Sequence, residues 1–172
     1  TIDLRDVDAV ARRGAAAILA AEARAELQRT RDHLERAIAA GTTVYGVNTG
    51  FGALNDTAIA PAELGALQQN LLRSHAVGVG EPVPPAITRV MLGLKVHGLG
   101  LGFSGVSLPT FRRLLDFACL DLLPVVPSRG SVGASGDLAP LAHLCLPLLG
   151  RGEFWNDDGT SKIPAADVLR AH

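Results

Sequence analysis

The tripeptide Ala134-Ser135-Gly136 could become an electrophile, a type of reactive group that unmodified side chains do not supply. The amide nitrogen of Gly136 could attack the carbonyl carbon of Ala134 and close a five-membered ring. Loss of two waters, one of them from the Ser135 hydroxyl, would then leave an exocyclic methylidene. Glycine suits this attack because it lacks Cβ and can bring its nitrogen close to the carbonyl. The same residues also fit a glycine-rich turn in which Ser135 or Asp137 caps the next helix, so the tripeptide alone leaves both interpretations open.

Three blocks of sequence change this balance. They are Tyr45–Gly52 (YGVNTGFG), Leu67–Ala76 (LQQNLLRSHA) and Gly130–Leu144 (GSVGASGDLAPLAHL). In this order and spacing they resemble the signatures of the aromatic amino acid ammonia-lyases, the histidine and phenylalanine ammonia-lyase family, and the resemblance runs from about Ile2 to the end of the chain. It implies that Ala134-Ser135-Gly136 forms a 4-methylideneimidazol-5-one (MIO) group autocatalytically. We therefore expect no external cofactor and no metal.

Tyr45 is the only tyrosine of the chain. It could anchor its hydroxyl at the edge of the core, or it could act as a general base. Removing ammonia from an α-amino acid requires abstraction of a weakly acidic β-proton, and a tyrosinate is strong enough if nearby positive potential lowers its pKa from about 10. The resemblance implies the second role, because Tyr45 matches the tyrosine that serves as base in the family.

Ser74 and His75 are the expected substrate contacts. A lone histidine at a helix end is more often a C-terminal cap than a ligand. The resemblance implies instead that this pair contacts the substrate side chain, and Ser-His is similar to the histidine-specific members, whereas phenylalanine- and tyrosine-specific members tend to have Phe-Leu or His-Leu. A histidine that forms hydrogen bonds suits an imidazole substrate. We expect conversion of L-histidine to urocanate and ammonia, with a phenylalanine or tyrosine ammonia-lyase or a 2,3-aminomutase as alternatives.

Two further residues lie in the third block. A helix that begins at Asp137 would place its positive end beside the prosthetic ring and stabilise negative charge there. For Asp137 itself we predict an N-cap in preference to a direct catalytic role. His143 lies within an apolar helical pattern, and we predict a structural role for it.

The hydrophobic pattern predicts a mainly α fold with minor β structure. Helices are expected at 15–40, 61–74, 87–101, 108–122 and 137–149, a short β-leaning segment at 42–48, a loop at 78–85 and a hairpin-like turn from Trp155. Gly93, Gly98 and Gly100 predict close helix packing, since glycine inside a helix costs about 1 kcal/mol relative to alanine. The resemblance implies one domain over residues 1–172, the N-terminal, prosthetic-group-bearing domain of the ammonia-lyase (fumarase/aspartase-like) fold.

Bulk properties argue against several function classes. The net charge is −1, with acidic and basic residues interspersed, so nothing suggests a nucleic acid or an anionic membrane as partner. The acidic N-terminus is no signal peptide, and the longest apolar stretch, Leu138–Leu149, is too short to span a bilayer. Cys119 and Cys145 are predicted to be buried free thiols in a reducing cytoplasm.

The chain is much shorter than the family it resembles. The later Asn, Tyr, Arg and Glu of the family's site are missing, as are the helices that assemble its homotetramer. Lys95 and Ser107 stand where arginine is expected, and Arg151 replaces an acid. Two hypotheses therefore remain: the N-terminal part of a lyase, inactive without self-association or a C-terminal partner chain, or a stand-alone, non-catalytic module.

Overall fold

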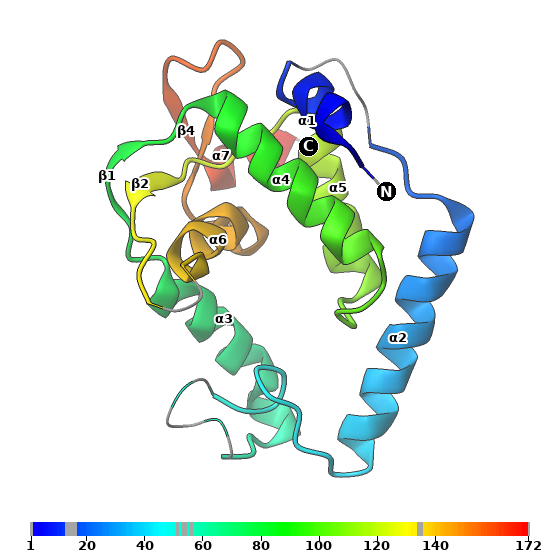
Figure 1. Cartoon of the computed structure of the whole chain (residues 1–172). Helices are drawn as coiled ribbons and strands as arrows, with labels where there is room; N and C mark the ends of the chain where they lie inside the picture. Colours follow the sequence, from blue (N-terminus) through cyan, green and yellow to red (C-terminus); the bar gives the residue numbers. More distant parts are fainter. Residues whose placement is uncertain are drawn as a thin grey trace.

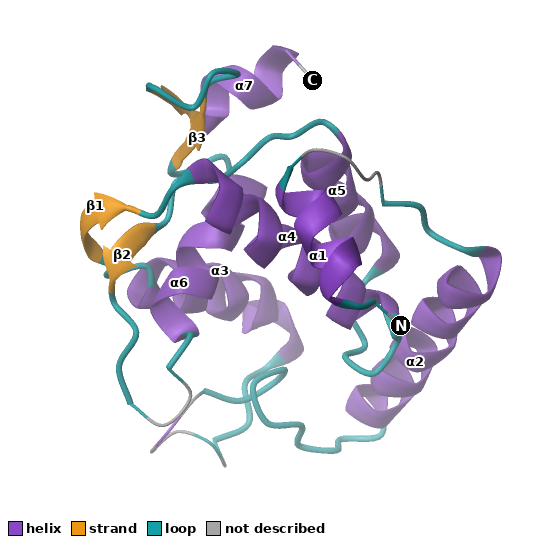
Figure 2. Ribbon diagram, turned by 45° about the horizontal axis from the view of Figure 1, so that its top comes forward, coloured by secondary structure: helices purple, strands orange, loops and turns teal. Residues whose placement is uncertain are grey.

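The computed structural model describes residues 2–12, 17–50, 52, 55, 57–133 and 136–171. Helices dominate, as the hydrophobic pattern predicts, and the strands form two small antiparallel pairs (Figures 1 and 2). The helices are α1 (Leu4–Ala11), α2 (Ala21–Ala39), α3 (Leu64–His75), α4 (Pro85–Gly100), α5 (Leu108–Cys119), α6 (Leu138–Cys145) and α7 (Ala165–Ala171), with 3-10 turns η2 (Pro61–Glu63) and η3 (Leu146–Leu149). The strands are β1 (Val79–Pro82), β2 (Pro127–Arg129), β3 (Glu153–Trp155) and β4 (Lys162–Pro164).

Helices α4 and α5 pack side by side and form the centre of the core (Figure 1). The α5 sequence places apolar residues three and four positions apart, so Phe111 and Phe117 face inward and are almost fully buried. The Phe117 ring meets Phe154 of β3 edge to face, with centroids 5.2 Å apart. Leu92 of α4 is also fully buried. The predicted helices at 87–101 and 108–122 are thus confirmed, with ends shifted by a few residues.

The N-terminal helices differ from the prediction. Helix α1 was not expected, yet Asp3 caps it by accepting the Arg5 and Asp6 amide N–H groups at 2.7 and 3.0 Å. The predicted helix at 15–40 begins only at Ala21, since residues 17–20 have no regular structure and 15 and 16 lie outside the described residues. Arg89 holds the far end of α1, because its Nη1 donates to the Ala11 carbonyl at 2.9 Å.

Two β assignments from the sequence are wrong. Residues 42–48 form a loop and turn, because the Asn48 side chain binds the Val44 N–H and the Thr42 carbonyl within its own segment. Backbone pairing starts only at the end of this segment, where the Asn48 carbonyl accepts the Ile59 N–H and Thr49 forms a bridge with Ala58. The segment 78–85, predicted as a loop, contains β1, which pairs antiparallel with β2 in an irregular register. This strand was not predicted from the sequence because Gly80 and Pro82 are of residue types that are disfavoured in strands. The hairpin near Trp155 is confirmed as β3–β4.

The predictions of close packing at glycines and of buried cysteines are confirmed only in part. A Cβ on Gly93 would lie 3.1 Å from Val10 Cγ1, which confirms close packing there, whereas a Cβ on Gly98 would meet nothing within 4 Å.

Cys119 is exposed and not buried, because it lies in the last turn of α5, where its Sγ donates to the Ala17 carbonyl. Cys145 is partly buried, and burial raises the pKa of its thiol.

None of the described helices is both long enough and apolar enough to cross a membrane.

Candidate functional site

Tyr45 lies on a turn that is supported from inside by Asn48. The Tyr45 side chain is 60% exposed, whereas Asn48 is only 7% exposed. The Asn48 Oδ1 accepts the Val44 amide N–H at 2.7 Å, and its Nδ2 donates to the Thr42 carbonyl at 2.9 Å. Asparagine and aspartate favour turns of this kind because their short side chains replace backbone partners. Asn48 therefore fixes the backbone on which Tyr45 is presented.

Thr49 completes this support. It is fully buried, and its Oγ1 accepts the Gly46 amide N–H at 3.0 Å and donates to the Gly50 carbonyl at 2.9 Å. Its backbone forms an isolated antiparallel bridge with Ala58. Asn48 and Thr49 were not singled out from the sequence. The available signal was two adjacent polar residues, three and four positions after Tyr45, inside a block that the resemblance had already marked.

Helix α3 connects the Tyr45 turn to the predicted substrate contacts. Gln68 Nε2 donates to the carbonyls of Gly46 and Val47 at 3.3 and 3.1 Å. His75 follows Gln68 by seven residues, which is two helical turns and about 10 Å along the same face. The turn that carries Tyr45 and the side chain of His75 therefore lie along one face of α3.

Ser74 and His75 are brought together at the end of α3. His75 Nδ1 lies 2.8 Å from the Leu71 carbonyl oxygen and 3.1 Å from Ser74 Oγ, and Ser74 Oγ donates to the same carbonyl at 3.1 Å. Because a carbonyl oxygen only accepts, Nδ1 carries the hydrogen in this arrangement. The neutral ring therefore has its lone pair on Nε2.

Helix α6, which follows the tripeptide, is fastened to the chain beyond α3. His143 Nε2 accepts the Gly78 amide N–H at 2.9 Å. Burial lowers the pKa of His143, which favours the neutral ring that this bond requires. The predicted structural role of His143 has a specific basis in this contact.

The loop that contains the tripeptide is closed at its base. A Cβ on Gly130 would lie 3.0 Å from the Gly78 Cα and 3.1 Å from the Ala139 Cβ, so the two ends of the loop meet against Gly78. Gly136 has a φ of 70°, in the left-handed region that favours glycine. Ala134 and Ser135 lie outside the described residues.

Asp137 occupies the N-cap position that the sequence predicts, directly before α6. Its backbone carbonyl accepts the Leu141 N–H at 3.0 Å, but among the described residues its side chain makes no capping hydrogen bond. Asp137 also borders a shallow hollow of about 360 Å³ between α4 and α6. Lys95 of α4 lines the same hollow, so a positive charge stands near the start of α6.

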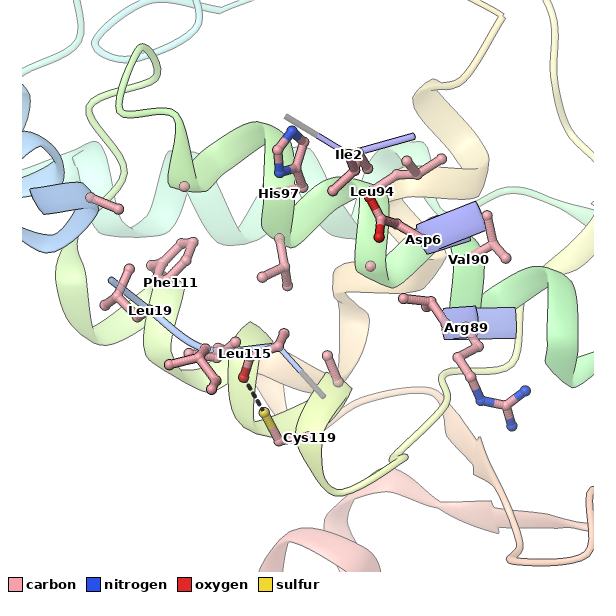
Figure 3. Close-up of a pocket in the computed structure, with 18 of the residues that line it drawn as sticks. Ile2, Asp6, Leu19, Arg89, Val90, Leu94, His97, Phe111, Leu115 and Cys119 are labelled. Carbon is pink, nitrogen blue, oxygen red and sulfur yellow. Dashed lines mark hydrogen bonds between the residues drawn. The ribbon is translucent and has the colours of Figure 1, made fainter. Parts of the chain in front are cut away.

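A cavity larger than this hollow lies elsewhere, between α1, α4 and α5 (Figure 3). It has a volume of about 1020 Å³, and none of the described site residues predicted from the sequence lines it. Its walls are mostly apolar, and Arg89 at its edge is already paired with Asp121 through bonds of 2.6 and 3.0 Å. No group of three potential metal ligands occurs within the described part of the chain. We therefore place the candidate site along α3 and the start of α6.

The chain is similar to known proteins over almost its whole length. The family model described as aromatic amino acid lyase matches residues 2–172. The histidine ammonia-lyase of Deinococcus radiodurans is 47% identical over 168 residues, which cover 98% of this chain and 32% of that protein. The structure of histidine ammonia-lyase from Trypanosoma cruzi superimposes with a TM-score of 0.82 at 37% identity, over 96% of this chain and 31% of that one. The structure of tyrosine aminomutase from Streptomyces globisporus superimposes with a TM-score of 0.90 at 30% identity, over 100% of this chain and 32% of that one. The chain spans about a third of the length of the curated relatives it matches.

Proposed function

The chain belongs to the aromatic amino acid lyase family, and on this premise we propose that it is the MIO-bearing, N-terminal part of a histidine ammonia-lyase. The reaction is elimination of ammonia from L-histidine to give urocanate. The observation that carries the proposal is that the Tyr45 turn and the His75 side chain lie along one face of α3, while α6, which follows the tripeptide, is joined to the chain beyond α3. Its relatives named histidine ammonia-lyase, at 43–47% identity, support the choice of substrate.

The described residues around the tripeptide fit an MIO group. Gly136 adopts a left-handed conformation, and the loop is closed at Gly130 and Ala139. Both features favour an approach of the Gly136 nitrogen to the carbonyl carbon two residues earlier. The bond between these atoms forms as the carbonyl oxygen leaves as water with the amide hydrogens of Gly136 and Ser135. The Ser135 hydroxyl leaves as a second water with the Ser135 Cα hydrogen, so no oxidant or reductant is needed.

The group, once formed, supplies the electrophile that activates the substrate amine for departure. Tyr45 takes the β-proton of the substrate as the general base. Asn48, Thr49 and Gln68 hold its turn against α3, so the hydroxyl is presented from a fixed backbone. Because the Tyr45 hydroxyl is already positioned, less conformational entropy is lost when the reacting geometry forms.

Substrate choice is assigned to His75. With the hydrogen on Nδ1, its Nε2 accepts a hydrogen bond from the N–H of the substrate imidazole. A phenyl ring offers no such donor to His75, which disfavours phenylalanine. We further propose that the chain works through self-association or with a C-terminal partner chain, and that the assembled homotetramer is cytoplasmic.

A substrate panel tests the proposal. The chain, supplemented with the remaining part of a histidine ammonia-lyase, is assayed with L-histidine, L-phenylalanine and L-tyrosine. We expect urocanate from L-histidine, and His75→Leu should shift the ratio of kcat/KM values toward L-phenylalanine by at least tenfold, about 1.4 kcal/mol. His33→Leu, on the exposed face of α2, is the matched control and should leave the ratio unchanged.

Three results would support the alternatives. Preference of the wild-type chain for an aromatic ring without nitrogen would favour a phenylalanine or tyrosine ammonia-lyase, and a β-amino acid product would indicate a 2,3-aminomutase. Failure of every substrate in the supplemented protein would favour the stand-alone, non-catalytic module.

A further inference from the structure

We propose that His143 is a positioning residue that fixes the base of the Gly130–Ala139 loop in the closed form needed for ring formation. It acts by accepting the Gly78 amide N–H, and it touches neither the reacting atoms nor the substrate. The inference rests on the proposed function for its consequence, ring formation, but its structural part concerns only described residues. His143 and Gly78 are 65 residues apart in sequence, so the contact joins two separate parts of the site.

Gly78 is the centre of this arrangement because it is enclosed on several sides. A Cβ at this position would lie 3.0 Å from His143 Nε2 and 3.2 Å from Pro127 Cβ. On another side, Gly130 packs directly on its Cα. A residue with a side chain would therefore have to displace α6, β2 or the start of the loop.

The two sides of the loop's base are held in different ways. Gly130 lies against Gly78 and Ala139, since a Cβ built on it would fall 3.0 and 3.1 Å from them, and the neighbouring β1–β2 pair, in which Val79 lies opposite Arg129, holds this side. The α6 side is joined to Gly78 by the hydrogen bond of His143, one turn beyond Ala139. Loss of this bond removes the directional contact between α6 and Gly78. Bringing the two ends of a loop together costs conformational entropy. When the ends of this loop are already fixed, ring formation does not have to overcome that cost again.

Only one protonation state of His143 can serve. A backbone N–H needs an acceptor, so Nε2 must carry a lone pair and the ring must be neutral with its hydrogen on Nδ1. Partial burial of the ring favours the neutral state, in agreement with this requirement. Glutamine at position 143 places an acceptor at a similar distance from the backbone and should still accept the Gly78 N–H. Leucine, which has a similar volume but no acceptor, should not.

Amide hydrogen exchange tests the structural part on the whole 172-residue chain. In His143→Leu, the Gly78 amide and the described loop residues should exchange about tenfold faster, the factor expected from loss of one hydrogen bond. His143→Gln should retain most of the protection. Leu144→Val is the matched control, since Leu144 is fully buried in the same helix and its truncation weakens packing without removing the acceptor. Unchanged exchange in His143→Leu, or equal acceleration in Leu144→Val, would overturn the proposal.

Intact mass, followed over time after synthesis, tests the consequence. His143→Leu should lose its two waters at least about tenfold more slowly than the wild type, with His143→Gln intermediate and Leu144→Val at the wild-type rate. Equal rates in wild type and His143→Leu would overturn the role in ring formation. A wild-type chain that keeps both waters would instead count against the proposed function, and the exchange result would still decide whether His143 holds the loop.

Discussion

The two halves of this molecule are held together in different ways. Around α4, α5 and β3 the side chains of Leu92, Phe111, Phe117 and Phe154 are buried to 2% exposure or less. Helix α3, described over its full length, buries no side chain to that degree. The α3 half depends instead on hydrogen bonds from Asn48, Thr49, Gln68 and His143, described above. The α3 part of the candidate site is therefore built where apolar burial is weak and single polar side chains set the geometry, whereas α6 also buries Leu144 in the core.

This difference separates stability from site geometry. Apolar burial contributes most of the free energy of folding, whereas one hydrogen bond contributes about 1 kcal/mol net. Changes in the α4–α5 half should therefore lower the free energy of unfolding of the whole chain. Changes in the α3 half should alter the site while most of that free energy remains.

The largest effect is expected from Phe117→Ala. Removal of this ring leaves a cavity against Phe154 and should lower the free energy of unfolding by about 3–5 kcal/mol. Urea denaturation followed by circular dichroism measures the loss. A loss below about 1 kcal/mol would mean that the α4–α5 half is not the main source of stability.

Asn48→Ala should have a smaller effect on stability and a larger one on the site. It removes the two side-chain hydrogen bonds by which Asn48 supports the Tyr45 turn, and we expect a loss of about 1–3 kcal/mol. Hydrogen exchange across residues 44–49 should become fast while α4 and α5 stay protected. The control is Asn70→Ala on the exposed surface of α3. Exchange that rises equally in both halves would contradict the separation.

Gly98→Ala should raise the free energy of unfolding by roughly 0.5–1 kcal/mol, because a Cβ at this position of α4 meets open space. Gly93→Ala in the same helix should gain less or lose stability, since its Cβ would press on Val10. Thermal unfolding of the two variants compares them directly. Destabilisation by Gly98→Ala would show that this face of α4 is covered in solution.

The smallest effect should be a pH dependence at His143. Burial lowers its pKa in the folded chain, so the unfolded chain binds more protons once the pH falls below the usual histidine value of about 6.5. The stability contribution is therefore full above that pH and declines as the pH falls through it. Urea denaturation at pH 7.5 and 5.5 should show a decline that is reduced in His143→Gln. An equal decline in both chains would assign the dependence to other groups.

Much of the helical fold could be predicted from the hydrophobic pattern, because α5 repeats apolar residues at helical spacing and the α4 segment is a long run that is apolar nearly all round. Helix α1 was missed because it is short and its stabilising feature is the Asp3 cap, not an apolar stripe. Strand β1 was missed because pairing with β2 involves residues almost 50 positions away, which no local pattern reveals.

The candidate site was predictable to the extent that its chemistry lies in local motifs. Tyr45, Ser74, His75 and the tripeptide occupy recognisable blocks, although the roles assigned to them remain proposals. The contact of His143 with Gly78 could not be predicted, since it depends on how α6 packs on the chain beyond α3. In general terms, the sequence indicates which groups react, whereas the long-range hydrogen bonds that position them require the structure.

Intact mass of the 172-residue chain, measured beside its Ser135→Ala variant, tests the central claim most directly. The account predicts that the wild-type chain is lighter than its sequence mass by two waters, and that Ser135→Ala loses at most one because it lacks the departing hydroxyl. A wild-type chain at its full sequence mass, indistinguishable in water loss from Ser135→Ala, would contradict the claim that this loop generates an electrophile.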